Sequence, residues 1–103
     1  MIIKDFEGRK IRLTTERLKH IKEHPEMRGL TQWIKETLIH PFKVVQSLSD
    51  SEVKLYYRFY FATIVGDKYL CVVVKARAND AFVLTAYLTD SMKKGVILWP
   101  KRL

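Results

Sequence analysis

The stretch "VKLYYRFYFATIVGDKYLCVVVKARA", residues 53–78, alternates between two kinds of side chain on either side of one glycine. A period of two is typical of β-strands, whose successive side chains point to opposite faces of a sheet. The dipeptide Gly66-Asp67 between the two runs is a strong signal for a two-residue hairpin loop. The stretch therefore predicts two antiparallel strands that turn at residues 66–67.

A two-residue loop at this point decides which side chains share a face. It pairs Val65 with Lys68 and, counted along both strands, places Arg58 opposite Lys75. One face is then apolar and is predicted to be the core, with Tyr57, Phe59, Phe61, Leu70, Val72, Val74 and Ala76. The other face carries Tyr56, Arg58, Tyr60, Lys75 and Arg77.

The stretch "FVLTAYLTD", residues 82–90, predicts the next strand, and its apolar set belongs with the same core: Phe82, Leu84 and Ala86. A two-residue loop would put these side chains on the wrong face. A three-residue loop at 79–81 or a β-bulge corrects the parity and pairs Lys75 with Thr85.

One sheet face is therefore expected to hold Arg58, Tyr60, Lys75, Thr85 and Tyr87. Two cations directly opposite each other repel, and no carboxylate on these three strands is in register to neutralise them. The arrangement favours an anion site that suits a phosphate. An ordinary solvated sheet face, on which lysine and arginine are common, is the alternative.

The flanking sequence predicts two helices before the sheet. "TTERLKHIKEH" has a threonine N-cap and ends before Pro25, and a second helix over 30–39 ends before Pro41. The remaining expected elements are two short extended pieces within 2–13, a strand within 42–48, and an edge strand within 96–103. The prediction is an α+β fold, with two N-terminal helices packed on a roughly four-stranded antiparallel meander, in one domain over residues 1–103.

The composition indicates a polyanionic partner. The net charge is +8, from 19 Lys+Arg against 11 Asp+Glu, which favours nucleic acid or an acidic protein. A membrane surface is disfavoured because no helix is both strongly basic and strongly amphipathic. No apolar run reaches about 18 residues and the start has no signal-peptide pattern, so a cytoplasmic protein is expected. The single Cys71 is expected to be a buried, inert thiol.

These residue types fit RNA cleavage without a cofactor. His20 or His24 could act as acid or base, while Arg58 and Lys75 hold the phosphate. Thr85 could donate a hydrogen bond to the phosphate, and Tyr87 or Tyr60 could stack on a base. Additional expected nucleic-acid contacts are Lys19, Lys54, Tyr56, Tyr60 and Arg77.

The two histidines leave other interpretations open. His20 and His24 are four residues apart, a spacing that suits zinc on one helix face, but the chain has no HExxH and no cysteine pair. They could also be ordinary helix-surface histidines. No glycine-rich phosphate loop and no nucleophile elbow occurs in the chain.

Several stretches together resemble the phage-type branch of the Barnase–EndoU–colicin–RelE (BECR) nuclease superfamily: "RKIRLTTERLKHIKEHPEM", "ETLIHPFKVVQS", "KLYYRFY", "KYLCVVVK" and "FVLTAYLTD". The resemblance covers residues 9–99. It implies a small metal-independent endoribonuclease, without a cofactor, that is toxin-like and paired with an acidic antitoxin or inhibitor. It maps the helix histidine to His20, preceded by Lys19 and with His24 as its rival. The strand cations fall on Arg58 and Lys75, and the Thr-x-aromatic pair on Thr85 and Tyr87.

A non-catalytic RNA-binding module with the same basic, aromatic face is the second hypothesis. A protein-interaction domain whose charge serves an acidic partner is the third. Cleavage that disappears with a 2′-deoxy block, while binding persists, distinguishes the nuclease from the RNA-binding module.

Overall fold

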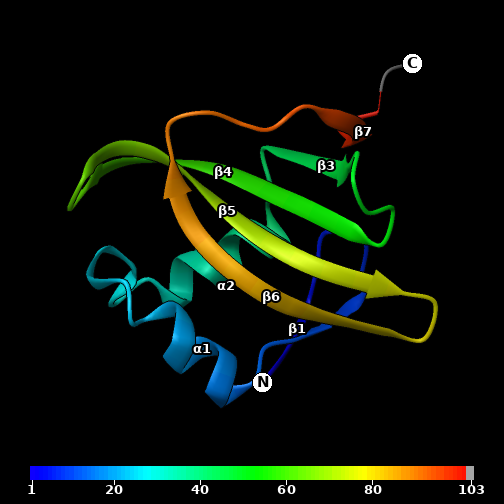
Figure 1. The fold of residues 1–103 in the computed structure, drawn as a ribbon, viewed down its shortest axis with the longest axis horizontal. Coiled ribbons are helices and arrows are strands. Elements are labelled where there is room, and N and C mark those ends of the chain that lie inside the picture. The colour runs from blue at the N-terminus through cyan, green and yellow to red at the C-terminus, as the bar shows by residue number, and fades with distance from the viewer. Residues whose placement is uncertain (102–103) are drawn as a thin grey trace.

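The computed structural model describes residues 1–101 of the chain. It contains one mixed sheet of seven strands and two α-helices (Figure 1). In chain order the elements are β1 (Ile2–Lys4), β2 (Lys10–Arg12), α1 (Thr15–Ile21), the 3₁₀ turn η1 (Pro25–Met27), α2 (Thr31–Ile39), β3 (Lys43–Ser47), β4 (Val53–Thr63), β5 (Gly66–Arg77), β6 (Asp80–Thr89) and β7 (Gly95–Trp99).

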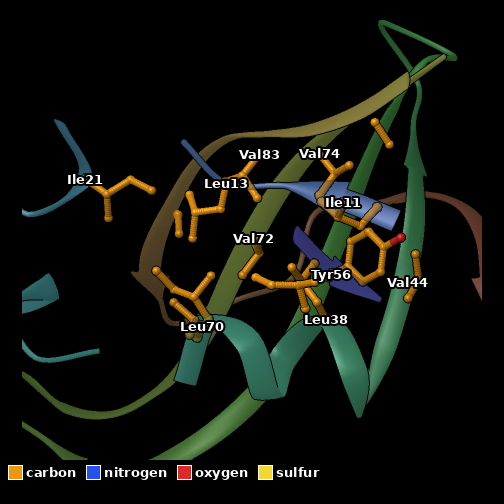
Figure 2. Close-up of a cluster of buried hydrophobic side chains, with 14 of the residues drawn as sticks. Ile11, Leu13, Ile21, Leu38, Val44, Tyr56, Leu70, Val72, Val74 and Val83 are labelled. Carbon is orange, nitrogen blue, oxygen red and sulfur yellow. The ribbon is translucent and has the colours of Figure 1, made fainter. Parts of the chain in front are cut away.

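The strands lie in the order β1-β2-β6-β5-β4-β3-β7, so the long strands β4, β5 and β6 form the centre. The helices cover one face of these strands, which we call the helix face; the opposite one is the open face (Figure 1). α1 packs against β6, while α2 packs against β5, β4 and β1. The main core lies between the helices and the sheet, and Figure 2 shows the Tyr56 ring in it near Ile11, Leu38 and Val44.

The expected four-stranded antiparallel meander is wrong. The extended pieces near the N-terminus are β1 and β2, and β2 joins the sheet beside β6 in parallel, with Arg12 opposite Phe82. The C-terminal piece is β7, which pairs with β3 at the other edge and ends before Pro100. Residues 102–103 of that expected strand lie outside the described residues. A strand of three residues is too short to show an alternation of apolar and polar side chains, so the sequence does not reveal that it belongs to the sheet.

The first helix is shorter than expected. Thr14 caps it, since its side chain accepts a hydrogen bond from the Arg17 amide, but the helix ends at Ile21. His24 lies beyond it, at the start of η1. The second helix ends at Ile39, as predicted. No helix in the described part of the chain is long and apolar enough to cross a membrane.

The hairpin between β4 and β5 turns earlier than the sequence predicts. Ile64 and Val65 form the turn, and Thr63 pairs with Gly66. Gly66 has φ +100, so the glycine follows the turn, as in a hairpin with a glycine bulge, and is not at its centre. Ala62, with φ +53, breaks the regular strand pairing next to the turn. The Ala62 amide donates a hydrogen bond to the Asp67 carboxylate at 2.8 Å, which supports this conformation.

This register exchanges the two faces of β4. Arg58 lies opposite Leu70 rather than Lys75, and Tyr56 lies opposite Val72. The shift from the expected pairing is an odd number of residues, which turns every side chain of the strand to the other face. Tyr56 and Tyr60 are therefore buried on the helix face, and the residues expected in the core, Tyr57, Phe59 and Phe61, lie on the open face.

The second hairpin contains the bulge that the sequence offered as one of two solutions. Its register shifts at Leu84, between the pairs Val73–Thr85 and Val74–Val83. The bulge places Val83 and Ala86 in the main core and leaves Thr85 on the open face. The core set expected for this strand, Phe82 and Leu84 with Ala86, is therefore correct only for Ala86.

A buried hydrogen bond connects the sheet centre to the N-terminal hairpin. The Tyr56 hydroxyl donates to the Asp5 carboxylate at 2.6 Å, and the other Asp5 oxygen accepts from the amides of Glu7 and Arg9. Asp5 is only 6% exposed, so its charge depends on these donors. Burial and the neighbouring Asp5 carboxylate both raise the pKa of Tyr56, which keeps the phenol protonated as a donor.

We expect Tyr56→Phe to lower the free energy of unfolding by about 1–3 kcal/mol, because it leaves a buried carboxylate oxygen without its donor. Urea denaturation measures this. The control is Tyr69→Phe, since the Tyr69 hydroxyl makes no hydrogen bond with a described residue. A change of less than about 0.5 kcal/mol is expected there. Equal effects of the two substitutions would contradict the role of the Tyr56–Asp5 bond.

Candidate nucleic-acid interface

A continuous row of aromatic rings lies on the open face. The ring centres of Phe61 and Phe59 are 5.1 Å apart, those of Phe59 and Tyr69 are 4.9 Å apart, and those of Tyr69 and Phe42 are 6.4 Å apart. We call Phe42, Tyr69, Phe59 and Phe61 the aromatic row. Phe61 is 75% exposed and Phe42 58%, although large apolar side chains normally gain free energy from burial. Neighbouring rings meet edge-to-face or tilted, at 83°, 72° and 36°, so the row offers separate apolar ring surfaces to a ligand and not one flat platform.

A second, smaller apolar cluster supports the open face at its centre. Tyr57 and Cys71 are fully buried in it, and Tyr87 packs against them. The Tyr57 hydroxyl accepts a hydrogen bond from the Lys93 amide at 3.0 Å, which connects the segment after β6 to the sheet. Burial raises the pKa of Cys71 to about 11 and that of Tyr57 to about 12, and it also raises the pKa of Tyr87. Cys71 is thus a buried thiol, as the sequence suggested.

Lys75 lies on the open face but is already paired. Its ammonium is 2.7 Å from the Asp50 carboxylate and 3.4 Å from that of Glu52, and its side chain is only 17% exposed. Hydrogen bonding to Asp50 raises the pKa of Lys75, and the same bond lowers the pKa of Asp50. The strands contain no carboxylate in register with Lys75, as expected, but neutralising carboxylates are present. They come from the loop between β3 and β4, which folds back over this end of the sheet.

Thr85 and Tyr87 share the open face with Lys75. Thr85 is opposite Val73 and Tyr87 is opposite Cys71, while Lys75 is opposite Phe82 and not opposite Thr85 as expected. Both side chains are half-buried, so part of each remains accessible. The three residues are the part of the expected site that the structure brings to one face.

Arg58 lies on the other side of the sheet. Its Nε donates to Glu36 at 3.0 Å, and its Nη1 donates to the His40 carbonyl at 2.7 Å, at the end of α2. Tyr60 donates to the same Glu36 oxygen at 2.8 Å and stacks on Trp33 at 4.1 Å. Arg58 thus anchors α2 and lines a cavity of about 660 Å³ on the helix side. The expected Arg58–Lys75 pair does not form because β4 has the opposite parity.

The two histidines are exposed residues of the helical segment. His20 Nδ1 lies 3.5 Å from a Glu23 oxygen, and His24 Nδ1 lies 3.8 Å from a Glu26 oxygen. Both belong to segments that cover the helix face, whereas Lys75, Thr85 and Tyr87 belong to the open face. No described contact joins the histidines to those three residues. Within the described residues, no group of three or more His, Cys, Asp or Glu side chains could hold a metal ion.

The other expected nucleic-acid contacts are scattered. Tyr56 and Tyr60 are buried in the main core, which corrects their assignment to an accessible face. Lys54 is near the start of β4, opposite Val74, and so lies on the helix face. Arg77 lies 3.7 Å from Glu52. Lys19 is exposed on α1.

Sequence reasoning missed the aromatic row and Lys43 beside it. Lys43 lies opposite Tyr57 and therefore points to the open face. The signal for the row was present, since aromatic residues alternate through 57, 59 and 61. Alternating aromatic residues are also typical of a core strand, and only the register distinguishes these two possibilities.

We expect the protein to lose stability steadily above about pH 9. Cys71 and Tyr57 keep their protons to higher pH in the folded protein, where their pKa values are about 11 and 12, than their ordinary values of 9.0 and 10.0. The unfolded chain releases those protons first, so each such group lowers the unfolding free energy by up to about 1.4 kcal/mol per pH unit. Urea denaturation between pH 8 and 11 measures this slope.

Cys71→Ala should remove the part of the fall in unfolding free energy that begins near pH 9. The decline from Tyr57, which begins near pH 10, should remain. A thiol reagent should react with native Cys71 only as fast as the protein opens, because the side chain is fully buried. Rapid labelling of the native protein at neutral pH would contradict this picture.

No family model, no curated protein and no solved structure matches this chain. The resemblance to BECR nucleases rests on the quoted sequence stretches alone. The arrangement of the open face is an independent observation.

Proposed function

We propose that the protein is a metal-independent endoribonuclease that binds single-stranded RNA across its open face. The observation that carries the proposal is the combination, on one sheet face, of an exposed aromatic row with Lys75, Thr85 and Tyr87. The resemblance to BECR nucleases supports the same activity.

The aromatic row suits the bases of a single strand. Rings spaced about 5–6 Å apart on a sheet can stack unpaired bases of any sequence, and each base stacked in this way contributes about 1–3 kcal/mol. The side chains of Phe59 and Phe61 are 37% and 75% exposed, so bases can reach them without a change in the fold. RNA in a duplex would not fit, because its bases are already stacked on one another.

Lysines beside the row suit the RNA backbone. Lys43 points to the open face, and Lys93 and Lys94 lie in the segment that crosses from β6 to β7. None of the three forms an ion pair with another described residue. Together with the net charge of +8, they support binding to phosphates by release of counterions.

Lys75, Thr85 and Tyr87 suit the reacting phosphate. The Lys75 ammonium and the Thr85 hydroxyl are donors for the negative charge that develops when a ribose 2′-hydroxyl attacks the adjacent phosphate. Tyr87 has a raised pKa and stays protonated at neutral pH, so its phenol can donate a proton or a hydrogen bond but is a poor base. His20 and His24, the acid and base that the resemblance implies, lie on the opposite side of the sheet, so neither can exchange a proton with a phosphate bound by these three residues. At this site the 2′-hydroxyl would lose its proton to water, and the leaving 5′-oxygen would take a proton from Tyr87 or from water.

RNA binding without cleavage is the second candidate. The ion pairs of Lys75 with Asp50 and Glu52 favour it, because a lysine that is already neutralised stabilises a phosphate less. The position of the histidines on the helix side favours it as well. The aromatic row serves binding equally in both cases.

Removing two rings of the row should weaken RNA binding. We expect the double variant Phe59→Ala/Phe61→Ala to bind a single-stranded ten-nucleotide RNA at least about tenfold more weakly, since each lost stack is worth about 1–3 kcal/mol. Fluorescence anisotropy at several salt concentrations measures this. The log–log salt slope should remain near its wild-type value, because phosphate contacts, at about −0.7 each, are unchanged.

Ile2→Ala is the control, since Ile2 is an exposed apolar residue of β1, at the edge of the sheet away from the row. It should bind RNA like the wild type. If the double variant also binds normally, the row is not the RNA-binding surface. Lys43→Ala should lower both the affinity and the salt slope.

Cleavage should depend on the open-face trio. We expect the purified protein to cut single-stranded RNA in EDTA, and a 2′-deoxy substitution at the cut position to abolish cutting while binding persists. Thr85→Ala should reduce the cleavage rate on the order of 10²-fold, as for the loss of one preorganised donor. Gel analysis of end-labelled RNA measures both rates.

The histidine variants locate the proton transfer. If His20→Ala and His24→Ala leave cleavage intact, the open face acts alone. If they abolish it while Lys75→Ala and Thr85→Ala do not, the reacting phosphate lies on the helix side. If the wild type binds RNA and cuts none, the second candidate is correct.

A further inference from the structure

The second half of β6 is a sheet edge without a partner strand. β2 pairs with β6 only at Arg12 and Phe82, and no other described strand lies beside residues 84–89 on that side (Figure 1). No described residue outside β5 forms a backbone hydrogen bond with this stretch. Its outward N–H and C=O groups therefore have no protein hydrogen-bond partner among the described residues, and a partner strand would satisfy them.

The edge strand itself carries none of the sequence devices against unwanted pairing, although α1 and η1 pack against β6. Sheet edges are normally short, charged, or interrupted by proline. The stretch "LTAYLT", residues 84–89, has no charge and no proline, and only the bulge at Leu84 marks where it begins. The other outer strands differ: β1 has three residues and includes Lys4, and β7 has five and is followed by Pro100 and Lys101.

We propose that residues 84–89 of β6 bind an extended acidic segment of a partner protein as an additional strand of the sheet. Strand addition uses main-chain hydrogen bonds for affinity and alternate side chains for specificity. The acidic character follows from charge complementarity. The protein carries +8, and α1, which packs against β6, exposes Arg17 and Lys19. Two exposed carboxylates lie nearby as well, Glu16 on α1 and Glu23 just after it, so the acidic preference rests on the net charge of +8.

A second copy of the chain is a poorer occupant for the same reason. Two edges from identical chains would bring two charges of +8 together, and like charges destabilise an association unless salt screens them. The inference does not depend on RNA cleavage, because the edge and its charge environment are independent of the aromatic row.

The test uses an eight-residue peptide in which glutamate alternates with valine, and two versions of it with N-methyl groups on every other residue. A peptide strand bonds to a sheet edge through the amides of alternate residues only. We expect the parent peptide and one methylated version to bind, and the other version to lose at least about tenfold in affinity. Titration calorimetry measures binding, and NMR should show amide shifts and slower hydrogen exchange at residues 84–89.

Two neighbouring proline variants test the edge itself. The amides of Leu88 and Thr89 point to opposite sides of β6, so one of Leu88→Pro and Thr89→Pro leaves the ladder with β5 intact. The variant that stays folded should no longer bind the parent peptide. A lysine–valine peptide of the same length is the charge control and should not bind.

Each other outcome overturns the proposal. Equal binding of both methylated peptides would show that the contact is not strand addition. Binding of the lysine peptide would refute the acidic specificity. A concentration-dependent dimer in sedimentation, with protection of residues 84–89, would assign the edge to a second copy. No peptide binding by the folded wild type would remove the edge as a docking site.

Discussion

The register of β4 against β5 is the constraint on which the rest of the structure depends. The Thr63–Gly66 turn, held by Gly66 at φ +100 and by the bond from the Ala62 amide to Asp67, sets this register. A strand has two faces, so a shift by an odd number of residues exchanges its entire contents between core and surface. These few turn residues therefore decide which side chains of β4 lie on the helix face and which lie on the open face.

The consequence is a separation of roles between the two faces. On the helix face, polar side chains are used internally: Tyr56 with Asp5, and Tyr60 and Arg58 with Glu36. These bonds secure the N-terminal hairpin and α2 to the sheet. The open face keeps the exposed rings of Phe59 and Phe61. Lys43 on that face has no ion pair with a described residue, whereas Lys75 is paired with Asp50 and Glu52. The surface proposed to bind single-stranded RNA thus consists of side chains that the register of β4 keeps out of the main core.

Part of the candidate site could be predicted from sequence and part could not. Lys75, Thr85 and Tyr87 share one face because Ala86 must point into the core on the other face. The bulge at Leu84 shifts β6 by one residue, which makes this alternation possible. Arg58 was misplaced because glycine serves both at the centre of a two-residue turn and in the bulge that follows a longer one. The ion pairs of Lys75 were missed because Asp50 lies in a loop, and a strand pattern contains no information about where a loop folds.

The sequence by itself determined the charge, the buried thiol, the positions of the long strands and the second helix, and the alternation along each strand. These depend on composition and on interactions between near neighbours, which are local in the chain. Only the tertiary structure decided which face of β4 meets the helices, that β1, β2 and β7 complete a seven-stranded sheet, and that half of β6 stays unpaired. Those features depend on pairing between distant segments, and pairing is settled by the burial of apolar surface and the satisfaction of backbone hydrogen bonds over the whole molecule.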